Sequence, residues 1–193
     1  MKERIIAEAR HLFNHFGVKT VRLEDIAREL GISKKTVYQY FDSKEELVRL
    51  MLESQLNENL QEANAIQLNV TNPIVGALLI WDRLIHYRRT VNPNLSRDIE
   101  RHYPTVWNLF QAFRTEYINT ILVSNLQQGI EQAIYRADLN ESVIAWLWAD
   151  QSQRETPYEN SDEPIKHHFV RGLLSPKGLT IYETLQNGSF ASV

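Results

Sequence analysis

The sequence predicts an all-α protein. Along most of the 193 residues, apolar side chains recur three and four positions apart, and Gly, Pro or Asn stands where these patterns stop. No stretch alternates apolar and polar residues as a half-buried strand does, so we expect essentially no sheet. The chain is 43% hydrophobic, which is typical of a folded domain and argues against disorder.

The first two expected helices cover residues 2–16 and 23–30. Six apolar residues form one face of the first helix, and Gly17 is its expected stop. In the second, Leu23, Ile26, Ala27 and Leu30 stand at i, i+3, i+4 and i+7, which makes one apolar stripe. The two helices can therefore pack against each other.

A third, short helix is expected over residues 34–41. Gly31 can end the preceding helix in the left-handed conformation, and Ser33 is a favourable N-cap for the next one. Only Val37, Phe41 and part of Tyr40 form an apolar seam, so most of the remaining surface carries hydrogen-bond donors. Two helices joined by so tight a turn form a helix-turn-helix, whose second helix can enter the major groove of DNA.

This segment resembles the signature of the TetR (tetracycline-repressor-like) family of bacterial transcription regulators. The resemblance covers about residues 3–50, and its matching positions are Ile26-Ala27, Gly31-Ile32-Ser33, Tyr38-x-Tyr40-Phe41, Lys44 and Leu47. One position departs from the family pattern, because Arg22 stands where Thr or Ser usually caps the first helix of the pair. The resemblance implies a sequence-specific DNA-binding regulator, usually a repressor, that recognises a palindromic operator in double-stranded DNA.

The resemblance also implies which side chains meet DNA. Gln39 is the best base reader, because its amide can pair with both N6 and N7 of adenine. Lys44 and the two tyrosines stand at positions that often hold phosphates, although the ring of Tyr40 could instead pack under the helix. The full expected set is Thr20, Arg22, Ser33, Lys34, Lys35, Thr36, Tyr38, Gln39, Tyr40 and Lys44.

Charge is distributed unevenly along the chain. Residues 1–50 hold ten Lys and Arg against eight Asp and Glu, a net of +2, whereas residues 51–193 hold 11 against 16, a net of −5. A positive head on an acidic body agrees with DNA binding, because positive charge near phosphate supplies affinity and steering.

The rest of the chain reads as a helical body. Ser43 and Glu46 have the spacing of a capping box, and neither Gly nor Pro interrupts residues 44–68, so one long helix is expected there. We predict a DNA-binding domain over residues 1–46 and an all-helical effector-binding and dimerisation domain over residues 47–193. Further helices are expected over residues 73–90, 95–103, 104–128, 165–174 and 177–185. One more is expected to begin after an N-cap at Asn140. Residues 151–162 are expected to form a loop, and residues 186–193 to fray.

The middle helices carry many aromatic residues. These residues could simply pack in a core, or they could line a pocket for a small apolar or aromatic effector, with groups such as His86, Arg88 and Asn125 orienting it. The resemblance implies such a pocket, and the candidate lining residues are Trp81, His86, Trp107, Phe110, Phe113 and Tyr117.

A homodimer is expected, because the helix-turn-helix of one subunit contacts only a few base pairs. In the family, two C-terminal helices of each subunit form a four-helix bundle; a monomer that buries these faces internally is the alternative. The candidate interface residues are Val143, Ile144, Leu147, Trp148, Phe169 and Leu173.

Other classes of function lack support in the sequence. There is no nucleophile elbow, phosphate-binding Gly loop or dinucleotide fingerprint, and Cys is absent, so we expect no enzyme activity and no cofactor. His11 and His15 lack a third ligand, so no metal is expected, and Asp162 and Glu163 look solvated. No apolar run reaches about 18 residues, so no membrane partner is expected and the protein should be cytoplasmic. The alternative function is a DNA-binding protein whose C-terminal domain docks a protein partner instead of a small molecule.

Overall fold

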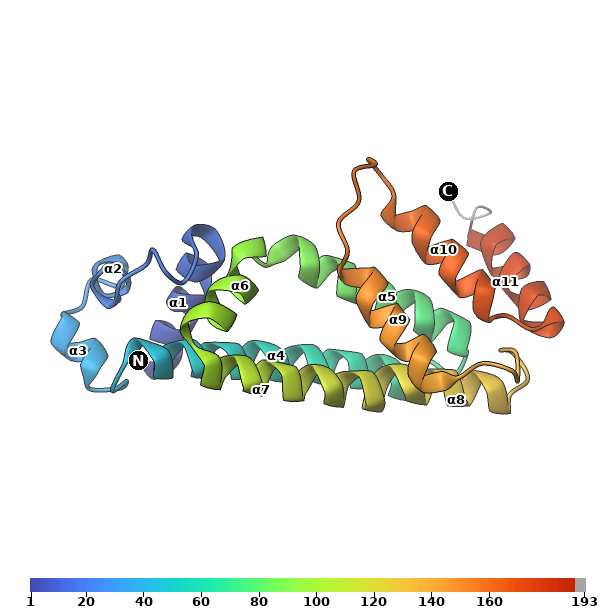
Figure 1. Ribbon diagram of the computed structural model, residues 1–193, viewed down its shortest axis with the longest axis horizontal. Helices are drawn as coiled ribbons and strands as arrows, with labels where there is room; N and C mark the ends of the chain where they lie inside the picture. Colours follow the sequence, from blue (N-terminus) through green and yellow to red (C-terminus); the bar gives the residue numbers. More distant parts are fainter. Residues whose placement is uncertain (190–193) are drawn as a thin grey trace. The chain divides into compact units, whose positions relative to one another are not determined.

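The computed structural model of this protein describes residues 1–189, and these are almost entirely helical (Figure 1). The described residues form no strand, although Tyr135 and Leu174 make an isolated antiparallel bridge. The helices are α1 (Lys2–Phe16), α2 (Leu23–Glu29), α3 (Lys34–Tyr38), α4 (Lys44–Asn69), α5 (Pro73–Thr90), α6 (Pro93–His102), α7 (Pro104–Tyr117), the π-helix η1 (Ile118–Val123), α8 (Ser124–Glu131), α9 (Glu141–Gln153), α10 (Asp162–Leu173) and α11 (Pro176–Ser189). The all-α prediction is therefore confirmed.

The chain divides into two compact units. Unit 1 comprises Met1–Leu60 and Arg89–Arg114, and unit 2 comprises Gln61–Arg88 and the chain from Thr115 onward. The divisions fall inside α4, α5 and α7, and not in flexible linkers. The functional boundary expected at residue 46 stays a prediction.

Unit 1 is built around α1, α2 and α3. The apolar face of α1 is buried, with Ile5 and Phe13 each at 0% exposure, and it packs with the stripe of α2. Val37 on α3 and Leu47 at the start of α4 complete the same core. Residues of α6 and α7 also belong to this core, so α1, α2 and α3 share their interior with a later part of the chain.

Local capping sets where several helices begin. The Asn72 side chain accepts a hydrogen bond from the Ile74 N–H, with Pro73 in the first helical position of α5. Asn140 accepts from the Val143 N–H and starts α9. At α4 the expected capping box is only half formed: Ser43 Oγ accepts from the Glu46 N–H, but the Glu46 carboxylate accepts from the N–H of Asp42.

Some helix ends differ from the expected ones. α9 continues to Gln153, and α10 already begins at Asp162, because Pro164 stands in the first turn, where a missing N–H costs nothing. α11 continues to Ser189, so the expected fraying at residues 186–189 is wrong, and residues 190–193 lie outside the described part. The expected long helix after Pro104 contains a π-helix over Ile118–Val123, which no sequence pattern indicated.

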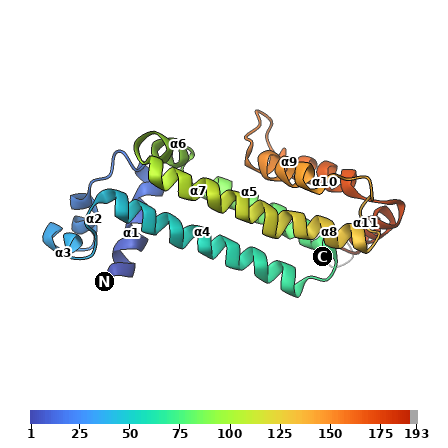
Figure 2. The same cartoon turned by 60° about the horizontal axis from the view of Figure 1, so that its bottom comes forward.

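In unit 2, an aromatic cluster joins α5, α9 and α10, and Figure 2 shows α9 and α10 alongside each other. The ring centroids of Trp81 and Trp148 lie 6.1 Å apart, and Phe169 lies 5.0 Å from Trp81 and 5.9 Å from Trp148. Trp81 and Trp148 are 1% and 0% exposed. These rings therefore form a buried core that ties three helices together.

Ion pairs hold α10 to α5. Arg88 donates to the Asp162 carboxylate at 2.6 Å and also to the backbone carbonyl oxygens of Ser152 and Arg154. The buried Lys166 ammonium lies 2.7 Å from both Asp82 and Glu163. The expectation that Asp162 is solvated is wrong, because its side chain is 14% exposed and binds Arg88, whereas Glu163 is exposed as expected and also pairs with Lys166.

Candidate nucleic-acid interface

The turn between α2 and α3 has the geometry that the sequence predicted. Gly31 has a φ of 65°, its N–H donates to Arg28, and the Ile32 N–H donates to the Ala27 carbonyl at 2.9 Å. This pair of hydrogen bonds is a Schellman motif, which ends α2 and redirects the chain. Ser33 Oγ then accepts from the Thr36 N–H at 3.0 Å and caps α3.

Two buried side chains hold α3 in place. Val37 is 0% and Phe41 is 1% exposed, so the opposite face of the short helix is turned to solvent. That face carries most of the residues expected to contact DNA; Tyr38 and Tyr40 are 46% and 39% exposed, so the Tyr40 ring does not pack under the helix as the alternative supposed. The exposed residues are Ser33, Lys34, Lys35, Tyr38, Gln39 and Tyr40, with Thr36 half-buried beside them.

An ion pair links the two helices of the motif. The Lys34 ammonium pairs with the Glu24 carboxylate on α2 and lies 5.6 Å from the centre of the Tyr38 ring. The hydrogen bond to Lys34 lowers the pKa of Glu24, and Glu24 raises the pKa of Lys34. A DNA phosphate that binds Lys34 must therefore compete with this carboxylate. No local sequence pattern indicates the pair.

The N-terminus of α2 is capped in an unexpected way. Arg22 has no side-chain oxygen that could cap, but its backbone N–H donates to the Asp25 carboxylate at 2.8 Å. Arg28 also donates to Asp25 at 2.8 Å, and the backbone bond, followed by Arg28, lowers the pKa of this carboxyl. Thr20 and the Arg22 side chain are exposed next to this helix end. An acidic residue three positions after a helix start is the sequence signal that could have revealed the arrangement.

The sequence predicts that Lys44 holds a DNA phosphate, but its ammonium group already has a partner within the chain. Its ammonium donates to the Val18 carbonyl oxygen and lies 5.8 Å from the centre of the Phe13 ring. Burial lowers its pKa. Lys44 thus fixes the loop before α2 to the start of α4, because its half-buried side chain turns inward at this helix end.

Helix α6 meets the same loop. The Lys19 N–H donates to Asp98 Oδ2 at 3.3 Å, and a Cβ built on Gly17, whose φ is 81°, would lie 3.3 Å from the same oxygen. The Asn92 amide lies 3.5 Å from the His15 carbonyl oxygen. Loop 17–22 is therefore held between α6 and the start of α4, all within unit 1.

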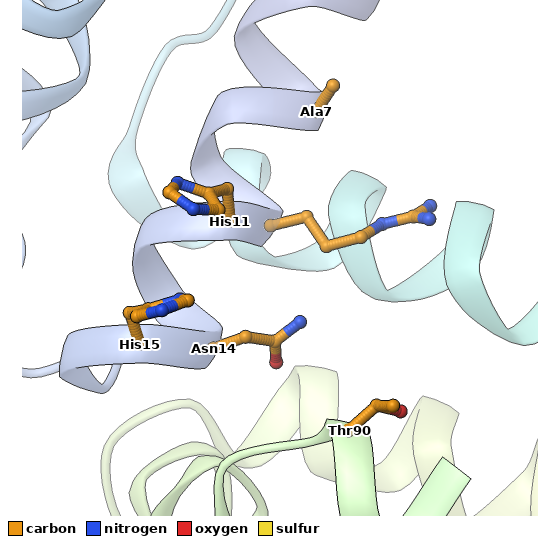
Figure 3. A pocket seen from close by; sticks show the side chains of 6 residues that line it. Ala7, His11, Asn14, His15 and Thr90 are labelled. Carbon is orange, nitrogen blue, oxygen red and sulfur yellow. The ribbon is translucent and has the colours of Figure 1, made fainter. Parts of the chain in front are cut away.

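A shallow cleft of about 440 Å³ lies beside α1, lined by Ala7, Arg10, His11, Asn14, His15 and Thr90 (Figure 3). Figure 3 shows His11 and His15 on successive turns of one face of α1, and their ring centroids lie 4.8 Å apart. Arg10 forms two 2.7 Å hydrogen bonds to Glu58, so its charge is neutralised. Among the described residues, no group of three His, Cys, Asp or Glu side chains could hold a metal ion.

The expected pocket residues fall into both units. Trp107, Phe110 and Phe113 are half-buried and pack on the core of unit 1, with the Trp107 and Phe110 ring centroids 5.3 Å apart. In unit 2, Trp81 belongs to the aromatic cluster and Tyr117 is 8% exposed, whereas His86 is exposed.

Two polar groups expected to orient an effector have other partners. Arg88 binds Asp162 and two carbonyl oxygens, and Asn125 Nδ2 donates to the Pro73 carbonyl at 3.1 Å. The expectation that these two groups face a ligand is therefore corrected.

The expected dimer residues are unequally exposed. On α9, Val143 is 52% exposed and Ile144 and Leu147 are half-buried, with the unpredicted Trp146 beside them at 51%. Trp148 is fully buried and Leu173 is 2% exposed, so within one chain their side chains have no surface to offer a partner. Phe169 is half-buried and its ring packs on Trp81 and Trp148.

Residues 5–51 match the family described as bacterial regulatory proteins, tetR family. The chain is 26% identical over 176 residues to an HTH-type transcriptional regulator, YvaF, of Bacillus subtilis, which covers 89% of this chain and 88% of that protein. It is also 37% identical over 57 residues to the biofilm operon icaADBC negative transcriptional regulator IcaR of Staphylococcus epidermidis, covering 30% of this chain and 31% of that protein.

Solved structures share the fold. A TetR transcription regulator from Haloarcula marismortui superposes with a TM-score of 0.73 at 18% identity, covering 90% of this chain and 98% of that one. A transcriptional regulator from Saccharomonospora viridis, solved in complex with choline, superposes with a TM-score of 0.74 at 17% identity, covering 90% and 97%. At these identities the likeness shows the architecture only. Within residues 1–189 no helix is long and apolar enough to cross a membrane.

Proposed function

We propose that this chain is a transcriptional regulator of the TetR family, as the match over residues 5–51 supports, and that it is a repressor that leaves a near-palindromic operator when a small molecule binds unit 2. The observation that carries the DNA-binding part is the solvent-facing side of α3. Val37 and Phe41 anchor this short helix, and Lys35, Thr36 and Gln39 stand on its outer side. In helix-turn-helix proteins this second helix lies in the major groove.

Direct readout is assigned to Gln39 and Lys35. The Gln39 amide can pair with adenine, and the Lys35 ammonium can reach guanine O6 and N7. Exposed Thr20, Arg22, Tyr38 and Tyr40 can hold phosphates on either side. Lys44 contributes by positioning loop 17–22, because its ammonium is already bound to the Val18 carbonyl.

A homodimer supplies a second helix-turn-helix, which can bind the second half-site of the operator. Two heads related by a two-fold axis read half-sites about 34–36 Å apart or at multiples of that spacing. The surface of α9 with exposed Val143 and Trp146 and half-buried Ile144 and Leu147 is the proposed contact between subunits. Apolar residues at this density on one exposed helix face favour a partner surface.

Effector control is proposed to act through differential affinity. A ligand that prefers one conformation of unit 2 can lower DNA affinity only by the difference between its affinities for the two conformations. A tenfold loss of DNA affinity needs a coupling of about 1.4 kcal/mol. Helices α4, α5 and α7 continue from one unit into the other, so a change in unit 2 has a covalent route to the DNA-binding head.

The test is selection of bound sequences from a random pool of DNA duplexes, repeated with candidate metabolites. We expect one near-palindromic consensus and its release by a ligand. Failure of duplexes of every composition to bind at low salt would contradict the DNA-binding assignment. Binding to a defined consensus that no metabolite changes, together with recovery of a specific protein on unit 2, would favour the alternative of a docked protein partner.

A further inference from the structure

Most buried polar groups in unit 2 are satisfied by the protein itself. The Tyr135 hydroxyl lies 2.8 Å from the Pro73 carbonyl oxygen and 3.1 Å from Asn125 Oδ1, and the Asn125 amide also donates to Pro73. Lys166 and Arg88 are likewise bound to carboxylates. This agrees with the general rule that buried polar side chains find hydrogen-bond partners.

Three aromatic side chains in the same unit break this rule. Within the described part of the chain, Trp81 Nε1, Trp148 Nε1 and the Tyr117 hydroxyl are buried and have no hydrogen-bond partner. The side chains themselves are at least nine-tenths buried, with exposures of 1%, 0% and 8%. An indole N–H can only donate, and a phenol hydroxyl can donate, so the shared deficiency is a missing acceptor.

The three donors come from helices that pack together. The Trp81 and Trp148 rings are nearly parallel, at 25°, and join α5 to α9. Helix α9 also packs against η1, which begins directly after Tyr117. π-Helical turns of this kind are frequently found at functional sites.

A cation lies near the Tyr117 hydroxyl. Arg83 on α5 lies close enough to Tyr117 for its charge to act on the phenol, and its guanidinium pairs with the exposed Glu62 carboxylate of α4. Burial raises the pKa of Tyr117 far above its ordinary value, so the phenol keeps its proton at neutral pH and can donate it to a ligand.

We propose that the effector of unit 2 is an apolar, ring-bearing molecule with a carboxylate or carbonyl oxygen, and that Tyr117, Trp81 and Trp148 donate hydrogen bonds to its oxygens. A cation such as a quaternary ammonium offers these donors no acceptor, so we expect it to bind more weakly than an oxygen-bearing ligand. Only the statement that this ligand is the effector rests on the proposed function. The binding of the ligand itself can be measured without DNA.

The direct test observes the indole N–H groups of the full-length protein by ¹⁵N NMR. The chain has four Trp residues, so single Trp→Phe variants assign every indole signal, and exposed Trp146 serves as the matched control. The probes are 2-naphthoate, 2-acetylnaphthalene and 2-naphthylmethylammonium, which share one apolar body. We expect the first two to move the Trp81 and Trp148 signals downfield and the ammonium to move neither. No movement with either oxygen-bearing probe at millimolar concentration, or a stronger response to the ammonium, overturns the proposal.

A pair of tyrosine variants separates ligand recognition from a structural role. Tyr117→Phe should weaken 2-naphthoate binding about tenfold while leaving the melting temperature unchanged or higher, because it removes a buried hydroxyl that has no partner. Tyr135→Phe makes the same chemical change at a hydroxyl that has partners, so it should lower the melting temperature and leave naphthoate binding unchanged. Equal loss of melting temperature in the two variants would mean that Tyr117 is structural and would overturn its assignment.

The selected operator then distinguishes the two proposals. If 2-naphthoate binds as expected and does not change operator affinity, the ligand class stands and effector control fails. If the ammonium releases the operator while the oxygen-bearing probes do not, effector control stands and the ligand class fails.

Discussion

At the scale of single residues, Gly31 shows how strongly the interface depends on one backbone conformation. Its φ of 65° is unfavourable for any residue with a Cβ, although nothing lies within 4 Å of a Cβ built there. We expect Gly31→Ala to lower the free energy of unfolding by about 1–2 kcal/mol through strain alone. Gly172→Ala is the matched control, since Gly172 also has open space but lies in a helix with a negative φ. Chemical denaturation should show no loss for the control.

Gln39 and Lys44 are expected to act on DNA in different ways. Gln39→Ala should reduce discrimination at one or two operator positions by about 1–3 kcal/mol, because a bidentate base contact is lost. Lys44→Ala should weaken binding to all sequences alike, because the ammonium positions loop 17–22. The measurement is the affinity of each substituted protein for a set of operator variants. If both substitutions change these affinities in the same way, this division of roles is wrong.

At the scale of the element, the start of α2 is held by a carboxylate. The Arg22 N–H and Arg28 lower the pKa of Asp25 from its ordinary value of 3.8. A depressed pKa means that the folded state holds the charged form more strongly, so the stabilisation is present above pH 3.8 and is lost as the pH falls through the lowered pKa. Asp25→Ala should therefore lower the melting temperature at neutral pH, and the difference from the unsubstituted protein should shrink in acid. Melting curves from neutral to acidic pH measure this difference. Asp42→Ala is the control, because Asp42 is exposed and it is its backbone N–H that donates to Glu46.

The pairing of Lys34 with Glu24 also belongs to this scale. The two residues are ten positions apart, and they meet only because the turn at Gly31 sets α2 beside α3. The same turn thus positions the DNA-reading helix and partly neutralises one of its cations. A binding partner with denser negative charge than one carboxylate, such as a phosphate backbone, can take over this lysine.

At the scale of the whole molecule, the proposed homodimer depends on the surface of α9. In a two-fold interface each residue contributes twice, so Val143→Glu would place two new carboxylates in one apolar contact. We expect this variant to sediment as a monomer at micromolar concentration and to bind operator DNA much more weakly. Leu68→Glu is the control, because Leu68 is 85% exposed on a different helix, α4. If Val143→Glu still sediments as a dimer, the proposed interface is wrong.

The local parts of this protein could be predicted from its sequence. The helix-turn-helix, the left-handed Gly31, the Ser33 cap and the burial of Val37 and Phe41 all follow from the nearest few residues, and all are confirmed. Such features depend on hydrogen bonds and periodicities that span one or two turns of helix. The family resemblance depends on the same short segment, which is why it could be found without a structure.

Only the tertiary structure decided where long side chains and aromatic rings point. Lys44 turns toward Val18, Asp162 binds Arg88, and Trp148 lies inside the chain instead of on its surface. Each of these depends on which helices pack together, and a helical period does not say which neighbour covers an apolar face. The sequence alone determined the helices and the DNA-reading motif, because those are set by local chemistry. The unpaired donors of unit 2 emerged from the fold, because a missing partner can be recognised only when every neighbour is known.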